Sequence, residues 1–279
     1  MKLTALMENQ AQDGLLCEHG LSVHIVFRGK QYLLDTGASD RFIKNADTMG
    51  IDLDQVDMAV LSHAHYDHSG GYEAFFACNH HAPAYLRAES RQRCYAKLLC
   101  FKKYIGIPPG LLETHAGRVC FVQESAQEID ADVWLIGHRA EGLAARGKRM
   151  RMVRKTPQGW RADDFMHEQS LVFCTGDGLV ILNSCCHAGV DRVVEEACAA
   201  LPGRPVRAVV GGFHLMGQGG VRTMGFSPEE VCALAHRLAE LGVEKIYTGH
   251  CTGAPAYEIL HRELGDRVQY FCAGSIVEL

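Results

Sequence analysis

Four side chains able to bind a metal ion lie within six consecutive positions: His63, His65, Asp67 and His68. His63 and His65 are two residues apart, so in extended backbone their rings point the same way. Asp67 and His68 are adjacent, so they diverge and can face two different metal ions. Imidazole and carboxylate ligands suit Zn, Fe, Ni or Mn, and not Ca. The spacing therefore predicts a metal site rather than a surface histidine patch.

Three later histidines, His187, His214 and His250, each follow an apolar run and neighbour small residues. Small residues let the backbone and a ligand approach closely. Ligands of α/β proteins gather at the carboxyl ends of strands. We expect His187 and His250 to bind metal. His214 either orients a substrate, supplies a missing ligand or has a purely structural role.

Strands and helices alternate in a way that places these residues at strand ends. Early apolar runs joined by turn residues predict strands at 21–27, 31–34 and 58–62, and a helix follows at 72–78. The second half predicts strands at 179–183, 206–210, 245–248 and 268–272, and helices at 190–200 and 256–264. A further helix begins at Ser227, where Pro228 and Glu230 complete a capping box, and ends at Gly242. This order predicts a layered α/β protein forming one domain over residues 1–279.

Two basic stretches interrupt this pattern. We expect a helical basic insertion at about 87–118, which Pro108-Pro109-Gly110 ends, and a basic loop or irregular hairpin at about 139–161. Both are either solvated surface or a patch that binds an anionic, aromatic small molecule through charge and stacking. The predicted substrate contacts are Lys102, Lys103, Arg149 and Arg151, with aromatic side chains from Tyr95, Phe101 and Tyr104.

Composition excludes several classes of protein. With 28 Lys and Arg against 33 Asp and Glu in 279 residues, the net charge of −5 argues against nucleic-acid binding. No apolar run approaches the length of a membrane span, and the first ten residues lack the apolar segment of a signal peptide. We therefore expect a cytoplasmic protein. Its 12 cysteines, none in a C-x-x-C pair, should be reduced thiols.

The motif His63-x-His65-x-Asp67-His68 resembles the metal motif of the metallo-β-lactamase superfamily, and Asp35 matches the early structural Asp of that superfamily. Four more segments resemble one branch, the dihydropterin–ribofuranosylaminobenzene phosphate synthases. They are Glu18-His19-Gly20-Leu21-Ser22, Cys186-His187-Ala188-Gly189, Gly212-Phe213-His214-Leu215 and His250-Cys251-Thr252-Gly253.

The resemblance implies an αββα sandwich, in which two mixed sheets are flanked by helices. It also implies two bound divalent metal ions, with Zn preferred over Fe or Mn. His63, His65 and a later histidine would hold one ion, and Asp67, His68 and His250 the other. The superfamily's bridging Asp has no counterpart beside His187. Asp177 is predicted to be a turn residue, so Glu168 or the Cys185-Cys186 pair is left to fill the gap, unless these thiols are structural. His19 either binds substrate or makes a hydrogen bond beneath the site.

The resemblance further implies an enzyme acting on a phosphorylated or otherwise anionic small molecule. In a hydrolase, a metal-bound hydroxide attacks the substrate. In a pterin-condensing enzyme, the metals stabilise a departing diphosphate while an arene attacks. Asp67 would bind metal and accept a proton, and His214 would assist catalysis. The alternatives are a non-catalytic, metal-dependent sensor or binding protein with this fold and, less favoured, a redox protein using Cys185 and Cys186.

Overall fold

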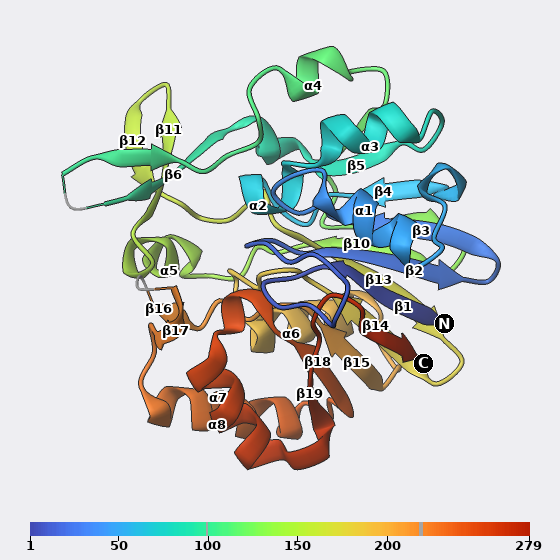
Figure 1. Ribbon diagram of the computed structural model, residues 1–279. Helices are drawn as coiled ribbons and strands as arrows, with labels where there is room; N and C mark the ends of the chain where they lie inside the picture. The colour runs from blue at the N-terminus through green and yellow to red at the C-terminus, as the bar shows by residue number, and fades with distance from the viewer. Residues whose placement is uncertain (99, 218–219) are drawn as a thin grey trace. The chain divides into compact units, whose positions relative to one another are not determined.

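The computed structural model describes residues 1–98, 100–217 and 220–279. The chain divides into two compact units. The first unit comprises residues 1–123, 141–168 and 272–279, and the second comprises residues 124–140 and 169–271. Each unit contains a seven-stranded mixed sheet with helices beside it (Figure 1). The predicted fold class, mixed α/β with two mixed sheets flanked by helices, is confirmed.

The large sheet of the first unit has the strand order β20-β1-β2-β3-β4-β5-β8. Neighbours from β20 to β3 are antiparallel, and those from β3 to β8 are parallel. Its strands are β1 (Lys2–Met7), β2 (Ser22–Phe27), β3 (Lys30–Leu34), β4 (Met58–Val60), β5 (Ala84–Arg87), β8 (Val119–Val122) and β20 (Ile276–Glu278). Its helical segments are α1 (Arg41–Thr48), η1 (Leu53–Gln55), α2 (Tyr66–Ser69), α3 (Tyr72–Cys78), η2 (Ala88–Arg91) and α4 (Leu111–Thr114). Phe42 of α1 and Phe75 of α3 are fully buried in its core.

The basic stretches form a second, four-stranded sheet of the first unit, ordered β12-β11-β6-β7. Its parts are β6 (Arg93–Lys97), β7 (Lys102–Tyr104), α5 (Leu143–Arg149), β11 (Met152–Thr156) and β12 (Gly159–Ala162). The expected helix within 87–118 is wrong at 93–97 and 102–104, where the structure has the strands β6 and β7. Strand β6 pairs with β11, some 60 residues later in the chain, and such non-local hydrogen bonds outweigh local propensity. The irregular hairpin predicted within 139–161 is present as β11 and β12, and α5 precedes it.

The sheet of the second unit has the strand order β19-β18-β15-β14-β13-β10-β9. Strands β14, β15, β18 and β19 run parallel, and the others antiparallel. The strands are β9 (Ala126–Asp130), β10 (Val133–Gly137), β13 (Gln169–Thr175), β14 (Gly178–Leu182), β15 (Val206–Val210), β18 (Lys245–Thr248) and β19 (Val268–Tyr270). Two further strands, β16 (Met216–Gly217) and β17 (Gly220–Met224), pair antiparallel with each other. The helical segments are α6 (Val190–Ala200), α7 (Pro228–Glu240), η3 (His250–Thr252), α8 (Ala254–Leu264) and η4 (Gly265–Arg267).

Helix α7 begins as its sequence predicts. The Ser227 hydroxyl accepts a hydrogen bond from the Glu230 amide, and the Glu230 carboxylate accepts one from the Ser227 amide. Val231, Ala235 and Leu238 form its buried stripe, four and three residues apart. None of the helices in the described ranges combines the length and apolar character needed to cross a bilayer.

Candidate metal centre

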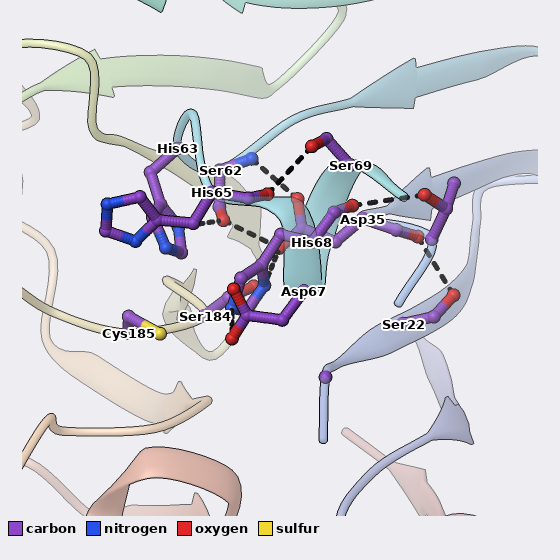
Figure 2. A network of polar contacts seen from close by, with 12 residues as sticks. Ser22, Asp35, Ser62, His63, His65, Asp67, His68, Ser69, Ser184 and Cys185 are labelled. Carbon is purple, nitrogen blue, oxygen red and sulfur yellow. Dashed lines mark hydrogen bonds and ion pairs between the residues drawn. The ribbon is translucent and has the colours of Figure 1, made fainter. Parts of the chain in front are cut away.

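Asp35 is the buried anchor of the predicted metal motif. Asp35 directly follows β3, and the metal motif directly follows β4. Because β3 and β4 are parallel neighbours, Asp35 and the motif lie at the same edge of the sheet. The Asp35 carboxylate accepts hydrogen bonds from the Ser62 amide (2.7 Å) and the Ser62 hydroxyl (2.6 Å), and its Oδ2 lies 2.8 Å from His68 Nδ1 (Figure 2). Ser62 Oγ in turn lies 2.8 Å from His63 Nδ1. One carboxylate thus orients two of the predicted ligands through their Nδ1 atoms.

The structure brings His63, His65, Asp67 and His68 together. The ring centroid of His63 lies 4.6 Å from that of His65 and 4.2 Å from that of His68, and all four side chains are buried. Burial lowers the pKa of His65 to about 3, which keeps the neutral ring that binds metal. Burial also disfavours charge on His68, but the carboxylates of Asp67 and Asp35 outweigh it and raise its pKa to about 10. A metal ion at His68 Nε2 would therefore replace a proton.

Gly70 and Gly71 allow the motif to pack closely on the loop that follows Asp35. A Cβ at Gly70 would lie 2.2 Å from the Ala38 carbonyl oxygen, and one at Gly71 would lie 2.5 Å from that of Ser39. The Thr36 amide donates to the His68 carbonyl at 2.9 Å. Backbone-to-backbone contact of this kind is possible only for glycine, which explains the Gly-Gly pair at the end of the motif.

Glu18 and His19 lie on the same loop and have different partners. Glu18 Oε1 accepts hydrogen bonds from the amides of Ala38 and Ser39, and its Oε2 accepts one from the Ser39 hydroxyl. His19 Nε2 lies 3.4 Å from Asp67 Oδ2, and the His19 side chain is 42% exposed. Glu18 therefore ties its loop to the segment that follows Asp35, whereas His19 lies beside Asp67 with a partly exposed ring.

His187, His214 and His250 lie at one edge of the sheet in the second unit. They follow β14, β15 and β18, which are parallel neighbours, so the three carboxyl ends share that edge. The ring centroids of His187 and His214 are 4.3 Å apart. His187 and His250 are buried, and His214 is half-buried. The histidines predicted from three separate strand ends thus lie in one region of the second unit.

Two thiols lie at the same edge. Cys251 Sγ is 3.3 Å from Cys185 Sγ, and both residues are buried. Burial would raise the pKa of the Cys251 thiol, but its contacts with Cys185 and His214 outweigh burial and lower this pKa to about 5. Cys251 is therefore disposed to be a thiolate, the form of cysteine that binds metal.

The candidates for a bridging ligand have different environments. Asp177 is exposed in the turn between β13 and β14, where its amide donates to the Thr175 hydroxyl. Glu168 is fully buried at the end of its segment in the first unit. Cys186 Sγ lies 3.7 Å from the Asn183 carbonyl oxygen, within its own loop. Asp177 thus has the predicted place in a turn, whereas Glu168 and Cys185 are buried.

A second cluster of the first unit was missed by sequence reasoning. The side chains of Cys94, Asp163 and His167 gather with that of His65, and all four are buried. His167 Nδ1 accepts a hydrogen bond (3.1 Å) from the amide of Ala64, the residue between His63 and His65. His167 Nε2 lies 3.3 Å from Asp163 Oδ2. Burial would raise the pKa of Asp163, but His167 and the Phe165 amide hold it well below its usual value. The spacing Asp163-x-x-x-His167 is the signal that could have shown the pair.

The four predicted basic contacts lie on or beside the small sheet. Lys102 and Lys103 belong to β7, and Lys103 Nζ lies 5.7 Å from the ring centroid of Tyr66, between His65 and Asp67. The Tyr66 amide donates to the Ile105 carbonyl at 2.9 Å. Arg149 ends α5, and the Arg151 carbonyl accepts the Lys97 amide at 2.7 Å. Both basic stretches thus meet in one sheet, and β7 adjoins the metal motif.

The residues of the first unit fit a divalent metal ion. Nδ1 of His63 and of His68 has a hydrogen-bonding neighbour, Ser62 and Asp35 respectively, and such contacts fix the tautomer that presents Nε2 to a metal. Asp67 Oδ2 lies 3.5 Å from His68 Nε2. Imidazole nitrogens with one carboxylate oxygen are a donor set for Zn, Fe or Mn.

Comparisons with known proteins agree with this geometry. Residues 17–145 match the family model described as the metallo-β-lactamase superfamily. A protein of Methanocaldococcus jannaschii named 7,8-dihydropterin-6-methyl-4-(β-D-ribofuranosyl)-aminobenzene-5′-phosphate synthase is 26% identical over 273 residues, which are 94% of this chain and 90% of that protein. The predicted resemblance to this branch is thereby confirmed.

Solved structures extend the match to the whole chain. The structure of Tm1679, described as a metal-dependent hydrolase of the β-lactamase superfamily, has a TM-score of 0.84 and 31% identity, covering 100% of this chain and 99% of that chain. YhfI from Bacillus subtilis, a metallo-β-lactamase fold protein, shares the fold at a TM-score of 0.58 and 10% identity, covering 100% and 98%. The chain belongs to the metallo-β-lactamase superfamily, whose fold implies the binding of a divalent metal ion.

Proposed function

We propose that this protein is a dinuclear metal-dependent enzyme that acts on a phosphorylated or otherwise anionic small molecule. The observation that carries the proposal is the buried group of His63, His65, Asp67 and His68, oriented by Asp35. Burying this many ionisable side chains is costly unless they serve a bound ion or a reaction. We assign His63, His65 and His187 to one ion and Asp67, His68 and His250 to the other, with zinc as the preferred metal.

Bound divalent ions would supply Lewis acidity and lower the pKa of a coordinated water. The chain's own residues have separate tasks. Asp67 is a ligand and accepts a proton, since its Oδ2 is within reach of His19 and His68. His19, 42% exposed, contacts the substrate from the surface. His214 orients the substrate or completes the ligand set.

The small basic sheet supports an anionic substrate with an aromatic part. A cavity of about 230 Å³ in the first unit is lined by Arg91, Arg93, Tyr95 and Tyr104, among others. The rings of Tyr95 and Tyr104 lie edge to face, 5.3 Å apart. Guanidinium groups beside aromatic rings suit a ligand with both a phosphate and a ring system.

Two reactions fit this site, and one screen separates them. Reduced protein loaded with Zn, Mn or Fe is offered phosphoesters, lactones and thioesters, and separately a pterin diphosphate with an aminobenzene ribose phosphate. Phosphate release from the single esters supports a hydrolase. Diphosphate release that requires the aminobenzene supports a synthase of the kind named for the Methanocaldococcus relative. Metal-loaded protein that turns over none of these compounds would contradict the proposal and favour a sensor.

The basic residues give a separate prediction. The double variants Lys102→Ala/Lys103→Ala and Arg149→Ala/Arg151→Ala should raise KM for a phosphorylated substrate several-fold or more. A charge-assisted hydrogen bond to a shielded phosphate contributes about 1.5–3 kcal/mol. The thermal stability of the lysine variant should change little, since Lys102 and Lys103 are exposed and exposed charges contribute roughly 0–1 kcal/mol each to folding.

The matched control is Lys30→Ala/Lys44→Ala, which removes two exposed positive charges elsewhere in the first unit. Its KM should equal that of the wild type. If all three double variants treat charged and neutral substrates alike, the small sheet is solvated surface and has no part in substrate binding.

A further inference from the structure

The carboxyl edge of the sheet in the second unit carries sulfur donors as well as histidines. Cys185 follows β14, His214 follows β15 and Cys251 follows β18. Both cysteines are buried, at 3% and 1% exposure. One ligand atom from each of the three side chains lies within 4.8 Å of the other two. Three parallel strands therefore bring two thiols and one imidazole into a single cluster.

The two sulfur atoms are close enough to bind one metal ion. Ligands at about 2.3 Å for sulfur and 2.0–2.1 Å for nitrogen can be at most about 4.6 Å apart across a zinc ion. The two sulfurs are 3.3 Å apart, within that limit and well beyond the length of a disulfide bond. His214 Nδ1 is buried and has no hydrogen-bond partner among the described residues.

The backbone around the cluster makes room for the Cys251 sulfur. A Cβ at Gly212 would lie 2.5 Å from Cys251 Sγ, so a side chain at position 212 would clash with the sulfur in its present position. His214 has a φ of 47° and His250, next to Cys251, a φ of 49°. Residues other than glycine are rarely held in this left-handed region, and such strain gathers at functional sites.

We propose that Cys185, Cys251 and His214 are ligands of a divalent metal ion, with two thiolates and one imidazole. This rests on the proposed function, because His187, assigned there to a metal, has its ring centroid 4.3 Å from that of His214. The proposal adds two sulfur ligands to the predicted histidine and aspartate ligands. They would take the part of the bridging carboxylate, which has no counterpart beside His187. Thiolates favour zinc, ferrous iron or cobalt over manganese and magnesium.

Cobalt substitution tests the assignment without measuring activity. The full-length protein, reduced and metal-free, is loaded anaerobically with Co(II), and its cobalt content and near-ultraviolet absorption are recorded. Thiolate ligation gives an intense sulfur-to-cobalt charge-transfer band. We expect this band in the wild type, about half of it in Cys185→Ser and in Cys251→Ser, and none in the double variant, because each substitution removes one sulfur donor.

Cys174→Ser is the matched control, since Cys174 is a buried thiol of β13 in the same sheet and lies outside the cluster. It should keep the full band. If a serine variant fails to fold, the corresponding alanine variant, which buries no hydroxyl, gives the same readout.

Cobalt binding without the band, or a band that both cysteine variants retain, would overturn thiolate ligation while leaving the metal centre in place. If the cobalt protein lacks the band and forms a Cys185–Cys251 disulfide once oxygen is admitted as the two-electron oxidant, thiolate ligation is overturned in favour of a redox role. Failure of the wild type to bind cobalt at all would overturn the proposed function as well.

Discussion

Asp35→Ala should destabilise the protein by about 3–5 kcal/mol and abolish metal binding, because it removes one member of a buried charged network. The carboxylate is fully buried and accepts from the Ser62 amide and the Ser62 hydroxyl, with His68 Nδ1 also 2.8 Å away. Without it these donors are buried unsatisfied, and the rings of His63 and His68 lose their orientation. Alanine is also strained at the φ of 58° that Asp35 adopts.

Urea unfolding with and without metal, together with metal analysis, measures both effects. Asp35→Asn should lose less stability and less bound metal than Asp35→Ala, because the amide oxygen can still accept a hydrogen bond from Ser62. Asparagine also tolerates the positive φ at this position. Asp57→Ala is the control: its carboxylate accepts the Gln31 amide at the partly exposed start of β3, so its loss should cost only about 1 kcal/mol. If Asp35→Ala and Asp57→Ala lower the free energy of unfolding equally and leave the metal content unchanged, Asp35 does not organise the site.

Asp67→Asn should reduce turnover at least about 100-fold while the fold stays intact. Asparagine keeps the shape of the side chain but removes the negative charge that the proposal assigns to a metal ion and to proton transfer. The Asp67 carboxylate lies 3.4 Å from His19 Nε2 and 3.5 Å from His68 Nε2, so the substitution removes a negative charge from beside both rings. Metal content per chain should fall, since two cations would be less neutralised.

Steady-state kinetics and metal analysis check this result, and circular dichroism of the metal-free variant should show the secondary structure of the wild type. Its melting temperature should fall somewhat, because Asp67 lies 3.5 Å from the buried ring of His68. Glu73→Gln is the control. It also removes a carboxylate charge beside a histidine, His115, but at an exposed position on α3. An Asp67→Asn enzyme with full activity and full metal content would refute the role given to Asp67.

Local signals predicted many elements well. The helix at 190–200 and the strands at 206–210 and 245–248 have the boundaries of α6, β15 and β18, because period and turn residues agree there. The strands at 93–97 and 102–104 were missed, since β6 needs β11 as its partner. A pairing across such a distance leaves no local periodicity to read.

The candidate site divides in the same way. His63, His65, Asp67 and His68 are neighbours in the sequence, so their types and spacing were enough to group them. The cluster of Cys94, Asp163 and His167 beside His65 joins three segments that no motif connects. The sequence also does not predict the left-handed backbone conformation of Asp35, His214 and His250. Tertiary contacts impose this conformation against the local preference of these residues.

The most direct test of the central proposal is the metal-to-protein ratio of reduced protein, loaded with zinc and freed of loose metal by gel filtration. The proposed function predicts about two ions per chain. A His63→Ala/His65→Ala variant, prepared in the same way, should hold clearly less. Wild-type protein that retains no more metal than this variant would contradict a metal centre built on these histidines.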